Sequence, residues 1–306
     1  MGFLRRKREE PTAVPDWAAF FTPDEYTAFL DAVKAELGKG GAQYTIGDGF
    51  VRVAGADGEL GLSNLAQLAH VTERNEWPQL VSSHFANLRA STGRDLDALG
   101  GDFEAVRSML RVRLLADESM GGVSLGDIGG SRAFAPGILM ALVYDFPDST
   151  ASVPLNHVEG WPLEADAVWA VAIDNVRLEP QPTRQDMPAQ SGVFTMTLGD
   201  SFYVASRALR LADELPPGTV DAVFAVPNRH MLLWHAIRDL SVVGAMQGMT
   251  LVTARAFLDG PGSISNQLYW WHEGQVVHLP VSPQGDSIAF IPPDEFLAFL
   301  DTLAAP

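Results

Sequence analysis

The sequence contains no cysteine among its 306 residues. This absence excludes disulfides, thiolate nucleophiles, iron–sulfur clusters and cysteine-ligated zinc sites. Long apolar runs are also missing, because none reaches the roughly 18 residues that a membrane-spanning helix needs. The basic start of the chain, Met1–Glu10, is not followed by the apolar segment of a signal peptide. We therefore expect a cytoplasmic protein with no integral membrane segment.

Basic residues are scarce compared with acidic ones. The chain has 21 Lys and Arg against 38 Asp and Glu, which gives a net charge of −17. Such a surface repels phosphate backbones, so we expect no nucleic acid partner. Four of the basic residues, Arg5 to Arg8, gather in residues 1–15, which we predict to be a basic flexible tail. Weak contact of this tail with an anionic membrane surface is the alternative interpretation.

The motifs that mark common catalytic and cofactor sites are absent as well. There is no glycine-rich phosphate-binding loop, no His-Glu-x-x-His zinc motif and no Gly-x-Ser-x-Gly nucleophile motif. The closest histidines in the sequence, His230 and His235, would point about 140° apart on a helix, so they cannot share a metal ion there. We predict no cofactor and no metal, and the sequence identifies no catalytic residue.

Apolar residues, in contrast, are plentiful. Hydrophobic types make up 47% of the chain, which is enough for a large core. Helix and strand signals alternate irregularly. A capping box at Thr22–Glu25 starts a helix, Ile138–Tyr144 is typical of a buried central strand, and Glu273-Gly274 predicts a hairpin turn. This mixture predicts an α+β fold, with mixed sheets and packed helices.

Glycine is concentrated in residues 117–132, at Gly121, Gly122, Gly126, Gly129 and Gly130. Such a segment is typical of a linker or a hinge, and a flexible loop over a site is the alternative. We therefore predict two loosely separable α+β lobes that meet near residues 118–132. The N-terminal lobe would cover residues 16–120, and the C-terminal lobe residues 130–306.

One junction in the C-terminal lobe combines polar and basic side chains. A strand predicted at residues 221–226 is closed by Pro227, and a helix is predicted from Asn228 to Leu240. Asn228, Arg229 and His230 would then lie at a helix N-terminus, which attracts anions. Arg207 could join them if its own helix is a neighbour. The alternative is that Asn228 caps the helix while the arginines pair with acidic residues.

Several short segments, taken in their order along the chain, carry a resemblance to a known family. They are Val143-Tyr144-Asp145, Trp161, Ala172-Ile173-Asp174-Asn175-Val176, Ala205-Ser206-Arg207, Val226-Pro227-Asn228-Arg229, Pro261-Gly262-Ser263-Ile264-Ser265 and Leu268-Tyr269. In these segments the chain resembles the YtpQ-type family of bacterial cytoplasmic proteins, and the Pro-Asn-Arg and Ala-Ser-Arg stretches are the specific part. The Arg-rich start is not a feature of that family. Because the family's domain has no assigned function, the resemblance implies a cytoplasmic setting and an α+β architecture, and it supplies no catalytic residue.

Two functions from different classes follow from these observations. The first is a non-catalytic protein-interaction or regulatory module, with a protein partner or self-association, since the chain lacks catalytic motifs and is rich in aromatic residues, with seven Trp and sixteen Phe. The second is a small-anion or phosphate-ester binding protein, or a hydrolase, with its site at the Asn228 junction. Its candidate anion-binding residues are Arg207, Asn228, Arg229 and His230.

Overall fold

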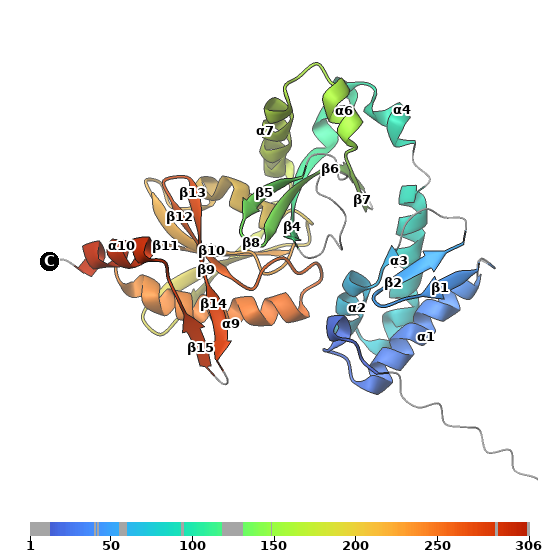
Figure 1. Ribbon diagram of the computed structural model, residues 1–306, viewed down its shortest axis with the longest axis horizontal. Coiled ribbons are helices and arrows are strands. Elements are labelled where there is room, and N and C mark those ends of the chain that lie inside the picture. The colour runs from blue at the N-terminus through green and yellow to red at the C-terminus, as the bar shows by residue number, and fades with distance from the viewer. Residues whose placement is uncertain are drawn as a thin grey trace, which may run out of the picture. The chain divides into compact units, whose positions relative to one another are not determined.

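The computed structural model describes residues 13–39, 41, 43–54, 60–92, 95–117, 131–147, 149–284 and 287–304. It confirms the α+β prediction, because helices and antiparallel sheets build the described part of the chain (Figure 1). Every strand pairing described there is antiparallel, so the sheets are not mixed. Most of the predicted basic tail and of the glycine-rich stretch lies outside the described residues.

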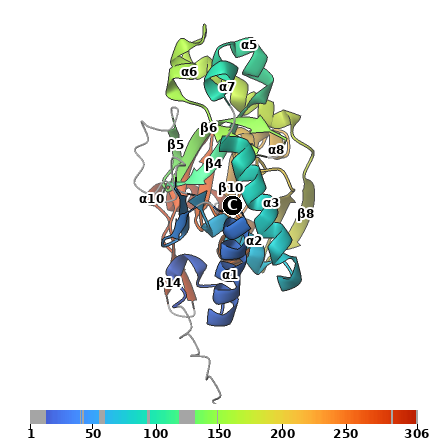
Figure 2. The same cartoon turned by 90° about the vertical axis from the view of Figure 1, so that its right-hand side faces the viewer.

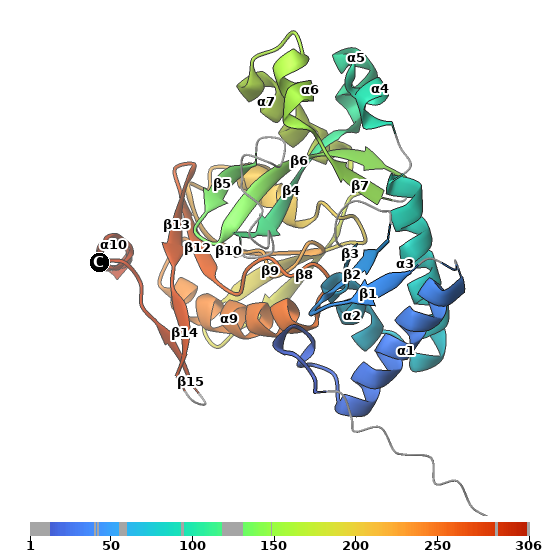
Figure 3. The ribbon, with the colours of Figure 1, turned by 45° about the vertical axis from the view of Figure 1, so that its right-hand side comes forward.

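The chain divides into two compact units, Met1–Thr92 and Gly93–Pro306. The elements of the first unit are η1 (Asp16–Ala18), α1 (Pro23–Lys39), β1 (Tyr44–Ile46), β2 (Phe50–Val53), β3 (Leu60–Gly61), α2 (Ser63–His70), η2 (Arg74–Glu76) and α3 (Trp77–Thr92). The predicted capping box starts α1: the backbone N–H of Glu25 donates to Oγ1 of Thr22, and the carboxylate of Glu25 accepts from the backbone N–H of Thr22. Helices α1 and α3 lie side by side and enclose the core of this unit (Figure 3).

The second unit begins with a four-stranded sheet and the helices that cover it. Its strands are β4 (Leu110–Ala116), β5 (Arg132–Ala135), β6 (Ile138–Phe146) and β7 (Ser149–Ser152), and β6 pairs with the other three. The surrounding elements are α4 (Leu96–Gly100), α5 (Phe103–Val106), η3 (Arg107–Met109), α6 (Leu155–Gly160), α7 (Ala165–Asn175) and η5 (Val176–Leu178). Helices α5, α6 and α7 lie on one side of β4 and β6 (Figure 2), where they bury the aromatic side chains of Trp161 and Trp169.

A six-stranded sheet in the order β13-β12-β10-β11-β9-β8 forms the rest of the unit. The remaining elements are β8 (Thr183–Pro188), β9 (Val193–Leu198), η6 (Ala205–Arg210), α8 (Leu211–Glu214), β10 (Asp221–Ala225), β11 (Met231–Ala236), α9 (Ser241–Asp259), β12 (Leu268–His272), β13 (Gln275–Leu279), β14 (Val281–Gln284), β15 (Ser287–Phe290) and α10 (Asp294–Ala304). Helix α9 covers one face of this sheet (Figure 3). On the other face, Phe224 and Tyr269 share a core with Leu114 and Ile138 of the four-stranded sheet.

The boundary between the units differs from the prediction. It lies between Thr92 and Gly93 rather than near residues 118–132. Strand β4 comes before the glycine-rich stretch, and β5 and β6 come after it. Strand β4 pairs with β6 from Leu110↔Tyr144 to Ala116↔Ile138, and β5 pairs with the other edge of β6. The stretch therefore connects two strands of one sheet, and glycine content alone did not distinguish such a connection from a linker between lobes.

The predicted helix after Asn228 is also wrong. Met231–Ala236 forms strand β11, so β10 and β11 are joined by a loop that offers no helix N-terminus. Leu232 packs into the core on one face of the six-stranded sheet, and Leu233 packs into the core on the other face. A strand buried on both faces is a continuous apolar run, which periodicity does not separate from a buried helix.

None of the helices that the structure describes combines the length and the apolar character needed to cross a lipid bilayer.

Candidate functional site

Residues 226–230 form the loop between β10 and β11, and Asn228 holds this loop in place. Asn228 is 4% exposed. Its Nδ2 donates a hydrogen bond to the carbonyl oxygen of Ala256 in α9 (2.9 Å), and its Oδ1 accepts one from the backbone N–H of His230 (3.0 Å). Both polar ends of the side chain are bonded within the chain, so Asn228 positions the loop rather than a ligand.

Arg229 and His230 are joined by a side-chain hydrogen bond. The Nε–H of Arg229 donates to Nε2 of His230 (2.8 Å), and Nδ1 of His230 lies 3.1 Å from the carbonyl oxygen of Gly199. Because Nε2 accepts and a carbonyl oxygen cannot donate, the proton of the neutral ring lies on Nδ1. Burial, and then the positive charge of Arg229, lowers the pKa of His230. His230 is therefore neutral at pH 7, and both of its ring nitrogens are engaged.

A second arginine, Arg113 of β4, approaches the same aromatic ring as Arg229. The guanidinium carbon of Arg229 lies 4.5 Å from the centroid of the Phe202 ring, and that of Arg113 lies 5.9 Å from it. Contacts of this geometry stabilise a cation by about 0.5–2 kcal/mol, depending on how far it is desolvated. We call Arg113 and Arg229 the arginine pair.

The arginine pair carries two positive charges without a carboxylate partner. Within the described ranges, no Asp or Glu oxygen lies within 4.0 Å of either guanidinium. Nη1 of Arg113 donates to Oγ1 of Thr150 (3.1 Å), whereas Nε of Arg113 is buried and has no hydrogen-bond partner. Burial, together with the charge of Arg113, lowers the pKa of Arg229 to about 10. Both arginines remain protonated at pH 7, so the protein holds two like charges close together.

Two partly buried acidic residues of the same unit, Asp145 and Glu179, make their contacts elsewhere. Asp145 accepts a hydrogen bond from the hydroxyl of Tyr203 (2.7 Å), and burial raises the pKa of this carboxyl. Glu179 forms an ion pair with Arg111 (2.8 Å) and accepts a hydrogen bond from Oγ of Ser201 (2.7 Å). Arg111 is thus neutralised, whereas Arg113, two residues further along β4, is not.

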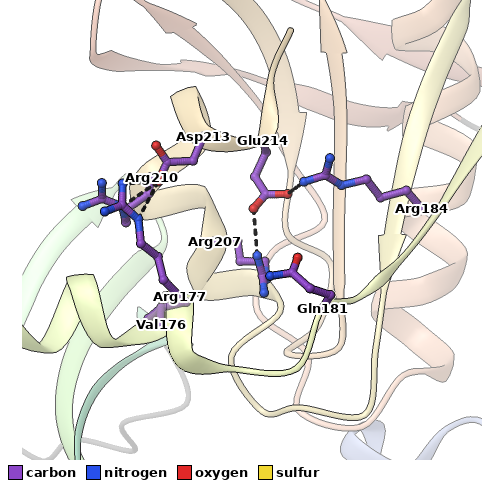
Figure 4. A pocket seen from close by; sticks show the side chains of 8 residues that line it. All are labelled: Val176, Arg177, Gln181, Arg184, Arg207, Arg210, Asp213 and Glu214. Atoms are coloured by element: carbon purple, nitrogen blue, oxygen red, sulfur yellow. Dashed lines mark hydrogen bonds and ion pairs between the residues drawn. The ribbon is translucent and has the colours of Figure 1, made fainter. Parts of the chain in front are cut away.

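Arg207, the fourth predicted site residue, lies in a different cluster. It is 8% exposed, and it donates from Nη1 to Oε1 of Glu214 (3.0 Å) and from Nη2 to the carbonyl oxygen of Pro180 (3.3 Å). Arg184 donates to the other oxygen of the same carboxylate (2.6 Å), as Figure 4 shows. The element that carries Arg207, η6, is a neighbour of the loop, as the prediction required, because the backbone N–H of Ala205 donates to the carbonyl oxygen of Arg229 (3.2 Å). The guanidinium of Arg207, however, is bonded to Glu214 and Pro180, and in the part of the chain that is described it makes no hydrogen bond to the Asn228 loop.

The sequence did not identify Arg113 or Phe202 as site residues. The alternation of arginines with apolar residues over 109–115 predicts a half-buried strand. The strand β4 is there, but it is not half-buried, because Arg111 is buried as well as its neighbours Leu110 and Val112. Alternation does not, however, distinguish Arg111, which has an acidic partner, from Arg113, which has none. That difference depends on residues far away along the chain, so no local pattern could have shown it.

No family model matches the chain, and no curated protein and no solved structure matches it either. The resemblance to the YtpQ-type family therefore stays a prediction. Among the described residues, no three His, Asp or Glu side chains lie together in a way that could hold a metal ion.

Proposed function

We propose that the protein binds a small oxyanion, such as phosphate or a phosphate monoester, at the arginine pair. The observation that supports this proposal is the pair of protonated guanidiniums without a carboxylate partner in the described part of the chain. Both side chains are partly buried, a partly desolvated charge without a counter-charge is unfavourable, and an oxyanion would remove that cost. Guanidinium N–H groups also match the geometry of phosphate and carboxylate oxygens.

The contacts of His230 favour binding over hydrolysis. A general base needs a free ring nitrogen within reach of the proton that it removes. Nε2 of His230 accepts from Arg229, and its Nδ1–H faces the carbonyl oxygen of Gly199, so neither nitrogen is available to a substrate. We therefore assign His230 the role of orienting the guanidinium of Arg229, and we propose a binding protein rather than a phosphoesterase.

Substitution of Arg229 by methionine tests this proposal. We expect the wild-type protein to bind inorganic phosphate in isothermal titration calorimetry in phosphate-free buffer, and the Arg229→Met and Arg113→Met variants to bind it about tenfold more weakly or worse. In the absence of phosphate, both variants should unfold at the same urea concentration as the wild type or at a higher one, because replacing one of two partly buried like charges by an apolar side chain relieves repulsion.

A matched control is Arg107→Met. Arg107 lies in the same unit, its side chain is 55% exposed, and it is paired with Glu104. This variant should bind phosphate as the wild type does. A wild-type protein that does not bind phosphate, or an Arg229→Met variant that binds it unchanged, would contradict the proposal.

The interaction module is the second candidate function, and exposed apolar side chains on the second unit favour it. Val243, Leu251 and Leu258 of α9 are 44%, 64% and 59% exposed, and spacings of eight and seven residues place them on one face of the helix. Ile291, shortly before α10, and Leu297, within α10, are 59% and 45% exposed. We place this function, like the first, in the cytoplasm and with no nucleic acid partner, in keeping with the net charge of −17.

Native mass spectrometry tests this second candidate. A homodimer formed through α9 should appear at micromolar concentration, and Leu251→Glu should return it to the monomer, because a charge in an apolar interface is not solvated. Val71→Glu is the matched control, since Val71 is 58% exposed but belongs to the first unit. A wild-type protein that is monomeric at high micromolar concentration would contradict self-association.

A further inference from the structure

A pocket of about 290 Å³ in the second unit has a local charge opposite to that of the whole chain. Its lining residues are Val176, Arg177, Gln181, Arg184, Arg207, Arg210, Asp213 and Glu214. Four arginines face two carboxylates here, whereas acidic residues outnumber basic ones nearly two to one in the chain as a whole. The volume would hold about ten water molecules, which is enough for a small organic molecule.

The charged side chains form two groups that lie apart in the pocket (Figure 4). In the first group, Oδ2 of Asp213 accepts hydrogen bonds from Arg177 (2.8 Å) and Arg210 (2.7 Å). In the second group, the two oxygens of Glu214 accept hydrogen bonds from Arg184 and Arg207. Each lining carboxylate is thus shared by two guanidiniums, so each group keeps an excess of positive charge before residues outside the lining are counted.

Asp174 lies outside the lining of the pocket and adds one further negative charge to the first group, because it accepts a hydrogen bond from Arg210 and pairs with Arg177 (3.9 Å). The two guanidiniums of the first group are then balanced, and the remaining excess of one positive charge belongs to the second group. Even so, the four guanidiniums outnumber the three carboxylates. The carboxylates also leave some N–H donors of the pocket without a protein acceptor. In the part of the chain that is described, Arg184 donates only from Nη2, and the side-chain amide of Gln181 makes no hydrogen bond. The acidic groups therefore orient the guanidiniums without using up their N–H groups.

We propose that this pocket is a second anion site, separate from the arginine pair, and that it takes a small dicarboxylate. Two groups of guanidiniums at different places in the pocket fit a ligand with an anionic group at each end. A single oxyanion would reach only one of them. A bisphosphate carries up to four negative charges against the two of a dicarboxylate, so the neighbouring Asp213 and Glu214 would repel it more strongly. A dicarboxylate provides planar groups that accept bidentate hydrogen bonds from arginine at each end.

Isothermal titration calorimetry with succinate, glutarate and adipate, against acetate at equal ionic strength, tests the proposal. At least one diacid should bind about tenfold more tightly than acetate. Arg184→Gln and Arg177→Gln, one in each group, should each weaken binding of that diacid about tenfold. Both side chains are about half exposed, 46% and 54%, so these variants should fold as the wild type does. Far-UV circular dichroism checks the fold.

Two controls make the result specific to this pocket. Arg107→Gln, an exposed arginine of the same unit outside the pocket, should leave diacid binding unchanged. Arg229→Met should also leave it unchanged, so failure of the oxyanion proposal would not affect this one. Equal affinity for acetate and for all three diacids would overturn the proposal, and so would unchanged diacid binding in the Arg184→Gln and Arg177→Gln variants. Tighter binding of pyrophosphate than of any diacid would overturn the choice of carboxylate.

Discussion

The Glu214→Gln variant should lower the free energy of unfolding of the second unit by about 3–5 kcal/mol, because it leaves a buried arginine without its counter-charge. The Glu214 side chain is 5% exposed and that of Arg207 is 8% exposed. Glutamine keeps nearly the same shape but removes the negative charge that also holds Arg184. Urea unfolding, with the midpoint and slope measured for both proteins, gives the difference.

Two further variants separate this cause from a general loss of packing. Asp213→Asn removes a carboxylate of the same pocket that is 41% exposed, and we expect it to cost less than about 1 kcal/mol. The double variant Arg207→Met/Glu214→Leu should recover most of the stability, because both buried charges are removed together. If Glu214→Gln lowers the free energy of unfolding by no more than Asp213→Asn does, burial does not make the Arg207–Glu214 ion pair more important for stability than the exposed one.

The Gly244→Ala variant should destabilise the protein by about 1–3 kcal/mol, although alanine is the better helix former. Gly244 lies inside α9 and is buried. A Cβ at this position would come within 2.1 Å of Oγ of Ser191 and within 2.6 Å of the backbone nitrogen of the same residue. The second contact is with backbone, so a rotamer change cannot relieve it. The thermal midpoint and urea unfolding both report the loss.

Gly38 provides the matched control for this prediction. It also lies in a helix, α1, but a Cβ there meets no atom within 4 Å. Gly38→Ala should therefore stabilise the first unit by about 0.4–1 kcal/mol, through the lower entropy of the unfolded chain. If both variants stabilise, the close approach of Ser191 to α9 is not maintained in solution.

Local signals in the sequence predicted several elements correctly. The capping box at Thr22–Glu25 starts α1, and the buried strand predicted at Ile138–Tyr144 lies within β6. The turn Glu273-Gly274 joins β12 to β13 with φ angles of 48° and 87°, the left-handed region that this type of hairpin turn requires. In each case the residues that determine the structure are neighbours in the sequence, so their own preferences are sufficient.

The prediction was wrong where burial on both faces hides the periodicity of a strand, as in β11. Local signals also suggested that Asn228, Arg229 and His230 form one site, and these residues do lie together in the β10–β11 loop. Arg113 is more than one hundred residues away in the sequence, yet it approaches the same aromatic ring as Arg229. Because this contact depends on how two sheets pack, no window of the sequence contains it.

The sequence by itself determined the α+β class, several strand and helix positions and the surplus of negative charge, because these depend on composition and on short-range preferences. Only the tertiary structure decided which charges are paired. Arg111 and Arg207 have buried or nearly buried carboxylate partners, whereas Arg113 and Arg229 have none among the described residues. The physical reason is that the energy of a charge depends on its distance to other charges and to water, and folding sets both distances.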